Sequence, residues 1–414
     1  ELREKLSWLG VPVSHGLGVF SPWSYYLPGS LIAAFRGLVG LRIAEVKPRL
    51  VDRWLLVSVE TSEGIAGVGE ASLWAYPKIV EGAVAELGRY YVGKDPWEIE
   101  HHWQTVFRNT HFGGAVLNAA LAAIDIALWD ILGKAVKLPV YRLLGGKCRE
   151  KVRVFAQVGA RSLEELAEQA AARVKEGFLA LRVTPFAPDA PKKPSSAVID
   201  DAVEQVKVIR EAVGYKVDLG VEVHRRLNPS EAIVLAKALE PYRLFFYEDP
   251  IPPQSIEAMA YVSSHITVPI ATGERLVNIC EFKDLLDRRA AGIIRPDVCL
   301  AGGLSHCKKI AAVAEASFAG VMPHITGSPV HTAATVQLDA CIPNYVLQDY
   351  DLAEAKPPKS RIVDQPLRFE RGYLIVPDRP GIGVELREDA LEDYPYRPSE
   401  IHGTFHEDGS VADW

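Results

Sequence analysis

Three glutamates end short apolar runs of the sequence at equal intervals, and their spacing could bring three carboxylates together. Residues 217–222, 244–248 and 269–274 end at Glu222, Glu248 and Glu274, which are 26 residues apart in both steps. A strand, a loop, a helix and a return loop take about that many residues, so the spacing predicts consecutive strands of a (β/α) barrel. Active sites of such barrels lie at the carboxyl ends of the strands, so the three side chains should share one barrel mouth.

Three converging carboxylates repel one another and raise their own pKa values unless a cation neutralises them. Ligand sets made of oxygen atoms suit Mg²⁺ better than Zn²⁺, which prefers nitrogen and sulfur. The sequence therefore predicts that Glu222, Glu248 and Glu274 bind Mg²⁺.

The same interval continues beyond the third glutamate and adds three more polar strand ends. Asp297 follows Glu274 by 23 residues, His324 follows Asp297 by 27, and Asp349 follows His324 by 25. One acidic residue at the start of a loop is more often a helix N-cap or a solvated side chain than a site residue. Six such residues in phase favour an active site.

Five short motifs in this region resemble those of a known family. The motifs are VEVH, YEDP, TGER, RPD followed by AGG, and PH, in this order between residues 221 and 324. They resemble the enolase superfamily in its mandelate racemase branch, and are most similar to the acid-sugar dehydratases, such as the galactonate and mannonate dehydratases. The resemblance covers most of the chain, and it implies a modified TIM (β/α) barrel with an α+β capping domain, an α/β fold.

His324 and Asp297 end adjacent strands of the expected barrel and are the predicted general base and its orienting carboxylate. A base held by a third group is a common arrangement, and the carboxylate also raises the basicity of the imidazole. The alternative is a structural histidine beside an unrelated capping aspartate, and the distance between the two side chains decides between them.

His224 lies two residues after Glu222, so strand alternation sends both side chains toward the same face of the sheet. From there His224 could deliver a proton to a leaving β-hydroxyl. The alternative is a supporting hydrogen-bond donor that takes no part in proton transfer.

The second barrel strand departs from the pattern of the related dehydratases. Many relatives carry a Lys-x-Lys pair there, and this chain has Arg182 and Thr184 instead. The pKa of arginine is too high for a base, so Arg182 is predicted to be a fixed donor to a carboxylate or hydroxyl. Mannonate dehydratases pair an arginine here with a tyrosine in the next loop, but residues 185–201 contain no tyrosine.

The first metal ligand of these dehydratases is usually aspartate, and Glu222 is one methylene longer.

Four further residues are predicted to contact the substrate. Arg275 and Arg295 could donate hydrogen bonds to it or to other site residues, and Asp349 ends the last strand in phase. Trp414 is suggested by the resemblance, because the chain-terminal tryptophan of mannonate dehydratases approaches the active site. A frayed or merely packed terminus is the alternative for Trp414.

Length and composition fit two domains and exclude several classes of function. The chain has 414 residues, more than one ordinary core, and is 48% hydrophobic and 24% charged with a net charge of −7. Nothing in this balance indicates a nucleic-acid surface, and we expect no association with membranes. The five cysteines form no CxxC pair, which favours a reducing compartment, so we expect a cytoplasmic protein.

We expect residues 1–150 to form the capping domain, residues 151–355 the barrel, and residues 356–414 a tail that returns to the capping domain. Alternating residues at 41–71 predict antiparallel strands, and three- and four-residue apolar spacing predicts helices at 79–91 and 117–137. The barrel should begin with a strand at 152–158, a helix capped by Ser162 and Glu165, and a second strand at 179–184. Residues 1–38 are predicted to be an arm that packs on this chain or on a neighbouring subunit, or a lid over the barrel mouth.

These residues predict a Mg²⁺-dependent dehydratase. It would abstract the α-proton of an aldonate such as galactonate, mannonate or gluconate and eliminate the β-hydroxyl to give a 2-keto-3-deoxy acid, with the cation stabilising the enediolate. One alternative is a racemase or epimerase that uses His324 from one face. Another is a catalytically weak metabolite-binding or regulatory protein, since the lysine and tyrosine bases are missing. The resemblance also implies a homo-oligomer, from dimer to octamer.

Overall fold

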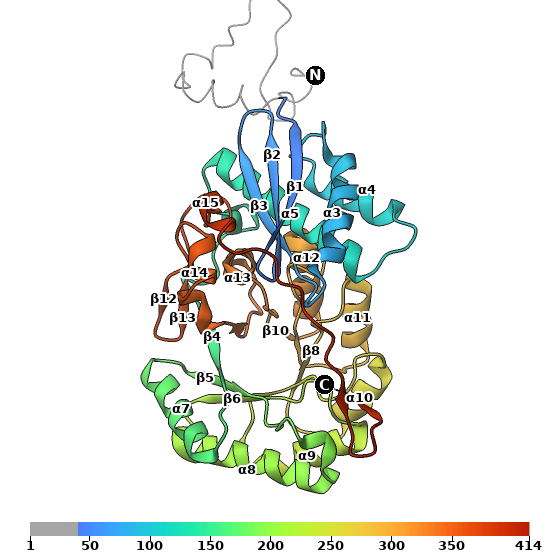
Figure 1. Ribbon diagram of the computed structural model, residues 1–414, viewed down its shortest axis with the longest axis vertical. Helices are drawn as coiled ribbons and strands as arrows, with labels where there is room; N and C mark the ends of the chain where they lie inside the picture. The colour runs from blue at the N-terminus through green and yellow to red at the C-terminus, as the bar shows by residue number, and fades with distance from the viewer. Residues whose placement is uncertain (1–39, 414) are drawn as a thin grey trace, which may run out of the picture.

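A computed structural model describes residues 40–413 of the chain (Figure 1). The arm or lid predicted at residues 1–38 and the substrate contact predicted for Trp414 lie outside the described residues.

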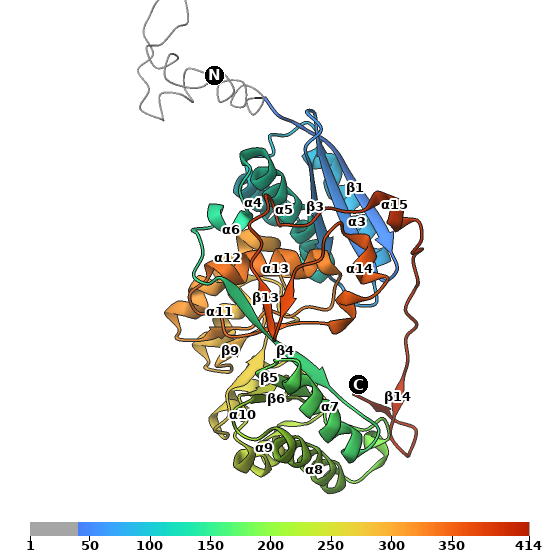
Figure 2. The ribbon, with the colours of Figure 1, turned by 90° about the vertical axis from the view of Figure 1, so that its left-hand side faces the viewer.

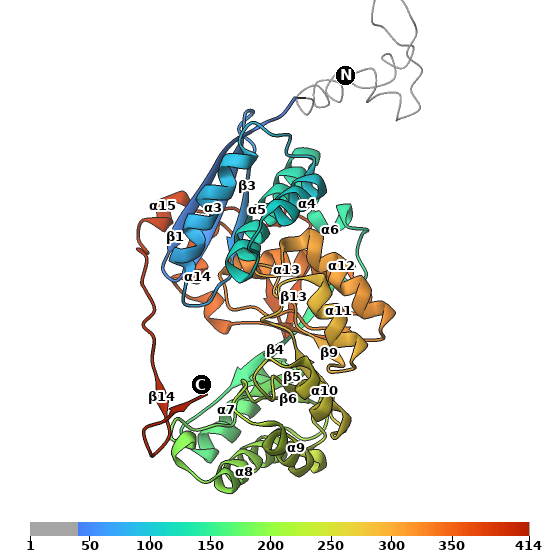
Figure 3. The same ribbon diagram turned by 90° about the vertical axis from the view of Figure 1, so that its right-hand side faces the viewer.

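The first domain is a three-stranded antiparallel sheet with helices on one face (Figure 3). Its elements are β1 (Ile43–Val51), β2 (Trp54–Thr61), β3 (Ala66–Ala71), α3 (Pro77–Tyr91), α4 (Ile99–Asn109) and α5 (Ala115–Val136). The predicted strands and both predicted helices of this region are present. β3 and α5 approach each other closely, because a Cβ on Gly69 would lie 1.9 Å from the carbonyl oxygen of Ala123. Glycine is therefore required at this contact.

Helix α5 is apolar on almost every face. Among residues 40–413 it is the one helix with the length and composition to cross a membrane, but 72% of its most apolar window is buried inside the structure. This burial identifies α5 as the core helix of the capping domain.

The second domain alternates strands and helices in a curved parallel sheet. The strands are β4 (Lys151–Val158), β5 (Ala180–Val183), β6 (Asp218–Glu222), β7 (Phe246–Glu248), β8 (Ile270–Thr272), β9 (Ile293–Ile294), β10 (Gly320–Val321) and β11 (Gln348–Asp349). The helices between them are α7 (Leu163–Lys175), α8 (Ser195–Val213), α9 (Pro229–Ala238), α10 (Ile256–Ser264), α11 (Ile279–Asp287), α12 (Gly303–Ala316) and α13 (Pro329–Cys341). The fold is the modified (β/α) barrel with a capping domain that the sequence predicts.

Neighbouring strands from β4 to β10 are paired in chain order, and β11 pairs with β4. No ladder joins β10 to β11 directly; a single parallel bridge between Val321 and Tyr345 connects the chain before β11 to β10. Buried side chains of the barrel strands, such as Phe155, Phe246 and Met322, pack together in the interior of the barrel. This packed layer leaves the chemistry to the carboxyl ends of the strands.

Local sequence signals set the helix starts in this domain. The side chain of Ser162 accepts a hydrogen bond from the backbone N–H of Glu165 and caps α7, as predicted. Asn228 and Asn278 form complete capping boxes with Glu231 and Glu281 at the starts of α9 and α11. Because each cap sets the first residue of its helix, it also sets the last residue of the loop that connects the preceding strand to that helix.

The chain after β11 contacts both domains. It contains η4 (Leu352–Ala355), α14 (Lys359–Ile362), β12 (Phe369–Glu370), β13 (Tyr373–Ile375), α15 (Glu388–Leu391), β14 (Thr404–Phe405) and β15 (Val411–Ala412); shorter elements earlier in the chain are α6 (Val140–Leu143), η2 (Ala190–Lys192) and η3 (Glu240–Tyr242). The β12–β13 hairpin pairs with β4 of the barrel. Beyond it, Asp52 next to β1 exchanges backbone hydrogen bonds with Tyr394 and Arg397, so the tail returns to the capping sheet there.

The last part of the tail leaves the capping sheet again. It runs as an extended segment to the β14–β15 hairpin, which lies beside the loop after β5 (Figure 2). His406 Nδ1 lies 2.8 Å from the carbonyl oxygen of Pro191 in that loop. The predicted return to the capping domain therefore describes only the middle of the tail.

Candidate active site

The carboxyl ends of β5 to β11, which we call the barrel mouth, bring the predicted acidic residues together. Glu222 and Glu248 are partners across the ladder of β6 and β7 and are 8% and 0% exposed. Arg182 reaches both from β5, with Nη1 2.8 Å from Glu248 Oε1 and Nη2 3.4 Å from Glu222 Oε2. Thr184, at the second position of the missing lysine pair, donates a hydrogen bond of 2.9 Å to Glu222 Oε2. Arg182 is thus a donor to carboxylates, as predicted.

Arg295 and Asp349 form a buried ion pair in the same mouth. Arg295 Nη2 lies 2.5 Å from Asp349 Oδ2 and 3.1 Å from Glu248 Oε1, and its side chain is fully buried. Burial tends to raise the pKa of Asp349, but Arg295 and Arg182 outweigh burial and hold it below its usual range. Arg295 thus donates to other site residues, one of the two roles predicted for it, and Asp349 pairs with Arg295 and Arg182. The predicted substrate contacts of both stay predictions.

Glu248 has one oxygen satisfied and one orphaned. Oε1 accepts from Arg182 and lies near Arg295, whereas Oε2 is buried and finds no hydrogen-bond partner among residues 40–413. Burial raises the pKa of Glu248 to about 8, against the opposing effect of the two guanidinium groups. A buried carboxylate oxygen without a partner is rare in folded proteins, so this atom indicates a ligand.

The donor set of the mouth fits Mg²⁺, because it consists of carboxylate oxygens and includes the orphaned oxygen of Glu248. The carboxylate oxygens of Glu222, Glu248 and Glu274 do not all lie within 4.8 Å of one another. Within residues 40–413, the group of His, Cys, Asp or Glu side chains whose ligand atoms all lie within 4.8 Å of one another consists of Asp297, Cys299 and His331. Arg182 lies between Glu222 and Glu248, which accounts for part of the separation.

His324 and Asp297 lie within hydrogen-bond distance. His324 Nδ1 is 2.9 Å from Asp297 Oδ2, and His324 Nε2 is 3.6 Å from Glu274 Oε2. Burial lowers the pKa of His324, but the carboxylates of Glu274 and Asp297 raise it to about 9. At this distance the carboxylate of Asp297 can orient the imidazole ring of His324; the role of His324 as a base stays a prediction.

His224 faces the mouth from a turn. β6 ends at Glu222, and His224 has a φ of 53°, so the strand alternation invoked for it does not extend to this residue. Burial lowers the pKa of His224, and the charges of Glu222 and Glu274 oppose that shift. His224 therefore lies near the predicted metal ligands, although the reason is the left-handed turn rather than the strand.

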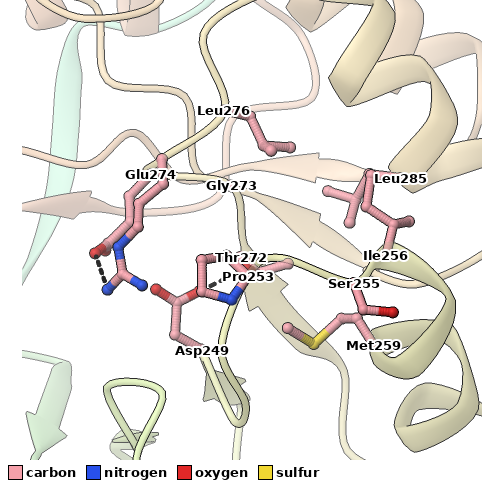
Figure 4. Close-up of a pocket in the computed structure, with 11 residues that line it drawn as sticks. Asp249, Pro253, Ser255, Ile256, Met259, Thr272, Gly273, Glu274, Leu276 and Leu285 are labelled. Carbon is pink, nitrogen blue, oxygen red and sulfur yellow. Dashed lines mark hydrogen bonds and ion pairs between the residues drawn. The ribbon is translucent and has the colours of Figure 1, made fainter. Parts of the chain in front are cut away.

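Asp249 is a further acidic residue at the mouth that the interval of 26 residues does not include. It is 3% exposed and accepts a hydrogen bond of 2.5 Å from Thr272 Oγ1. Burial raises the pKa of Asp249 to about 7, and Glu274 adds to the shift. Figure 4 shows both carboxylates at a small cavity of about 20 Å³, where Arg275 Nη2 lies 3.4 Å from Glu274 Oε1. Asp249 is the second acidic residue of the YEDP motif, and this position was the signal in the sequence that could have identified it.

A larger groove of about 790 Å³ opens beside the mouth. The loop after β5, the loop after β6 and the β14–β15 hairpin line it, with polar groups from Lys193, Arg226 and His406. Arg225 Nη1 lies 3.7 Å from Asp413 Oδ1, so an ion pair connects the tail to the loop that carries His224. The last described residues of the tail thus reach the neighbourhood of the mouth.

Two contacts of Asp297 come from residues that no motif identifies. Ser72 Oγ, from the end of β3, donates to Asp297 Oδ2 at 3.1 Å across 225 positions of sequence. His331 Nε2, from α13, lies 3.3 Å from Asp297 Oδ1. Such long-range contacts leave no signal in spacing or periodicity.

Comparisons with known proteins agree with this architecture. Residues 45–145 match the model of the mandelate racemase/muconate lactonizing enzyme N-terminal domain, and residues 165–390 match the enolase C-terminal domain-like family. The chain is 35% identical over 374 residues to a D-galactonate dehydratase of Variovorax paradoxus (strain S110), with 88% of this chain and 98% of the relative covered. It is 36% identical over 370 residues to a D-galactonate dehydratase of Xanthomonas oryzae pv. oryzae (strain PXO99A), with 87% and 97% covered.

A solved structure extends the similarity to three dimensions. The crystal structure of an enolase from Agrobacterium radiobacter, bound to Na and L-malate, superposes with a TM-score of 0.85 at 31% identity. The match covers 90% of this chain and 99% of that chain.

Proposed function

The chain belongs to the mandelate racemase/muconate lactonizing enzyme branch of the enolase superfamily and is a sugar acid dehydratase, and from this premise we propose that its substrate is an aldonate such as galactonate, mannonate or gluconate. The product is the corresponding 2-keto-3-deoxy acid. The names of the relatives favour galactonate among these acids.

In this proposal His324 removes the α-proton through Nε2, the ring nitrogen that does not face Asp297. Asp297 holds Nδ1 at 2.9 Å and so fixes the orientation and tautomer of the ring. His224, near Glu222 and Glu274, donates a proton to the departing β-hydroxyl. Arg182 and Arg295 hold the surrounding carboxylates and keep their oxygens in place.

We assign Mg²⁺ to Glu222, Glu248 and Glu274, and when bound it would stabilise the negative charge that develops on the substrate carboxylate. The orphaned Oε2 of Glu248 supports this assignment. The Agrobacterium structure, which binds a cation and a 2-hydroxy acid, supports a site for an acid substrate in the same fold.

A single observation carries the proposal. His324, three residues after β10, lies 2.9 Å from Asp297, three residues after β9, and its other ring nitrogen is 3.6 Å from Glu274, a predicted metal ligand. That arrangement supports a base and an orienting carboxylate close to where the substrate carboxylate would bind. We further propose that the protein is cytoplasmic, which its five free cysteines support. We also propose that it is a homo-oligomer, as the family resemblance implies.

The test is NMR in D₂O with a panel of aldonic and aldaric acids. We expect the wild type to form a keto acid from at least one of them. His324→Asn should abolish both keto-acid formation and exchange of the α-proton, because no base remains. His224→Asn should retain exchange while elimination slows about 10²- to 10⁴-fold, the usual contribution of general acid catalysis. His265→Asn is the matched control, since His265 is exposed at the end of α10.

Other outcomes identify other functions. Exchange with inversion and without keto acid would mean an epimerase. Wild-type protein that binds the acids without exchange would mean a binding protein. Exchange that persists in His324→Asn would remove His324 as the base.

A further inference from the structure

His331 is a buried imidazole that the proposed chemistry does not use. It belongs to the first turn of α13 and is 0% exposed. Among the described residues, neither of its ring nitrogens has a hydrogen-bond partner of ordinary geometry. A buried polar group in this state calls for an explanation, because its desolvation is not repaid by a hydrogen bond.

The two ring nitrogens face two different carboxylates. Nε2 lies 3.3 Å from Oδ1 of Asp297, the carboxylate that orients His324. A Cβ on Gly327 would lie 2.7 Å from His331 Nδ1 and 2.4 Å from Glu70 Oε1, so these two atoms flank the same point. His331 therefore lies between Glu70 and Asp297.

Glu70 anchors the helix that carries His331. It is 1% exposed on β3 of the capping sheet and accepts hydrogen bonds from Ser328 N at 3.0 Å, Ser328 Oγ at 2.6 Å and His331 N at 3.1 Å. A carboxylate at a helix N-terminus satisfies N–H groups that have no partner within the helix. Glu70 thus fixes the start of α13 and the position of His331 with it.

Asp297 is held by four groups, two at each oxygen. Oδ1 accepts from Cys299 N at 2.8 Å and faces His331, and Oδ2 accepts from Ser72 Oγ at 3.1 Å and faces His324. Burial alone would raise the pKa of Asp297, but His331 and His324 lower it below its usual range. His331 is therefore suited to keep this carboxylate both ionised and fixed in rotation.

We propose that His331 is a positioning residue for the dehydration reaction: it holds Oδ1 of Asp297 so that Oδ2 stays aimed at Nδ1 of His324. The inference rests on the proposed function, in which His324 is the base. Because Glu70 lies on β3 and Ser72 directly follows it, the proposal also makes the capping domain part of the apparatus that orients the base.

A metal ion held by Asp297, Cys299 and His331 is the competing interpretation of this cluster. Two observations count against it. Both oxygens of Asp297 already accept hydrogen bonds, and burial raises the pKa of the Cys299 thiol well above its usual range, whereas a metal needs the thiolate. The cluster is better explained as a set of groups that hold Asp297 in place.

The experiment compares His331→Leu with His331→Gln. Leucine keeps the volume but removes the contact with Asp297, whereas the amide nitrogen of glutamine can replace Nε2 as a donor. We expect the leucine variant to lose about 10- to 100-fold in kcat, the usual cost of removing an orienting partner, with KM nearly unchanged. The glutamine variant should recover most of that loss.

A second measurement does not depend on turnover. The low-field proton resonance of the bond between His324 and Asp297, assigned by its disappearance in His324→Asn, should shift or broaden in His331→Leu and stay in place in His331→Gln. The matched control is Thr332→Val, which is equally buried in the same helix turn and loses its hydrogen bond to Glu354 without touching Asp297. It should leave both the resonance and kcat unchanged.

The possible failures are distinguishable. If wild-type protein makes no keto acid, the proposed function fails while the resonance still tests the role of His331. A leucine variant with wild-type kcat and an unshifted resonance would overturn the inference. Equal losses of kcat in the leucine, glutamine and Thr332→Val variants would also overturn it, because they would show a purely structural effect.

Discussion

Two of the regions that bury carboxylates, the domain junction and the barrel mouth, differ in the partners they offer. In the domain junction, Asp125 and Asp130 of α5 contact residues of the barrel, the tail and β3. In the barrel mouth, Glu222, Glu248 and Asp349 lie close together among two arginines. Both sets lie in low-dielectric surroundings, where an unpaired charge is costly.

The junction carboxylates find their partners mainly in the backbone. Asp130, which is fully buried, accepts from Val68 N at 3.0 Å and from Ile382 N at 2.8 Å, and pairs with Lys134 at 2.8 Å. Asp125 accepts from Ser305 N at 3.0 Å and Ser305 Oγ at 2.5 Å. Every oxygen of these two side chains has a protein donor, so the chain itself completes the arrangement.

The mouth carboxylates are incompletely satisfied. In the part of the chain that the structure describes, Glu248 Oε2 has no hydrogen-bond partner, although the side chain is fully buried. The difference teaches that burial of an acid does not by itself mark a functional site. An acid that backbone donors satisfy stabilises the fold, whereas a free buried oxygen among other acids at a barrel mouth suits a ligand.

The largest effect should come from Glu248→Gln in the mouth. The substitution keeps the shape and removes one of the three charges proposed to hold Mg²⁺, so we expect affinity for the ion to fall more than about 100-fold, with activity lost in parallel. Calorimetry with Mg²⁺ measures the affinity directly. The unfolding midpoint without metal should change little, because the variant removes a carboxylate whose ionisation burial disfavours.

Thermal unfolding with added Mg²⁺ provides the control. Mg²⁺ should raise the midpoint of the wild type and not that of the variant, because only the binding-competent protein gains stability from the ion. An unchanged affinity in Glu248→Gln would mean that the ion has other ligands and that the orphaned oxygen needs another explanation.

The same change in the junction should have the opposite signature. In Asp130→Asn the new NH₂ group faces one of the two backbone N–H donors that the carboxylate accepted from, and Lys134 loses its ion-pair partner. We therefore expect a loss of about 3 kcal/mol in the free energy of unfolding. Chemical denaturation measures the loss. The folded fraction should keep its Mg²⁺ affinity and kcat, since Asp130 contacts no residue of the mouth; a loss of either would contradict the comparison.

The contrast between the two regions was only partly readable from the sequence. Glu222, Glu248 and Glu274 could be placed at one mouth because the barrel repeats at a fixed interval, which sets where each strand ends. The same regularity placed Asp297 and His324 on adjacent strands, and their distance of 2.9 Å agrees with it.

The partners of these acids could not be predicted, because tertiary packing decides them. Ser72 and Glu70 reach the base from the capping sheet, and their partners Asp297 and Ser328 are 225 and 258 positions away in sequence. The conformation of His224 depends on a left-handed turn that strand alternation does not foresee. Periodicity thus gives the position of a side chain on its element, and it gives no information on which donor arrives from another domain.

A third prediction concerns the pH dependence of stability in the junction. Burial raises the pKa of Asp125 from 3.8 to about 7, against the hydrogen bonds from Ser305. Between these two pH values the native protein holds a proton that the unfolded chain has released. The contribution of Asp125 to stability is therefore fully present below pH 3.8 and is lost as the pH rises through about 7.

Asp125→Asn isolates this contribution from that of the mouth, where Glu248, with a pKa raised by burial to about 8, titrates in the same sense. The variant cannot ionise, so the difference in unfolding free energy between wild type and variant should fall as the pH rises from 4 to 7. Its slope is at most about 1.4 kcal/mol per pH unit, the value for one proton. Above about pH 8 the difference should be constant, because Asp125 is then ionised in both states. Denaturant titrations at several pH values measure the curve. A flat difference from pH 4 to 8 would mean that Asp125 is ionised in the native protein throughout, so that its bonds to Ser305 outweigh burial; the junction would then tolerate a full buried charge more readily than the mouth.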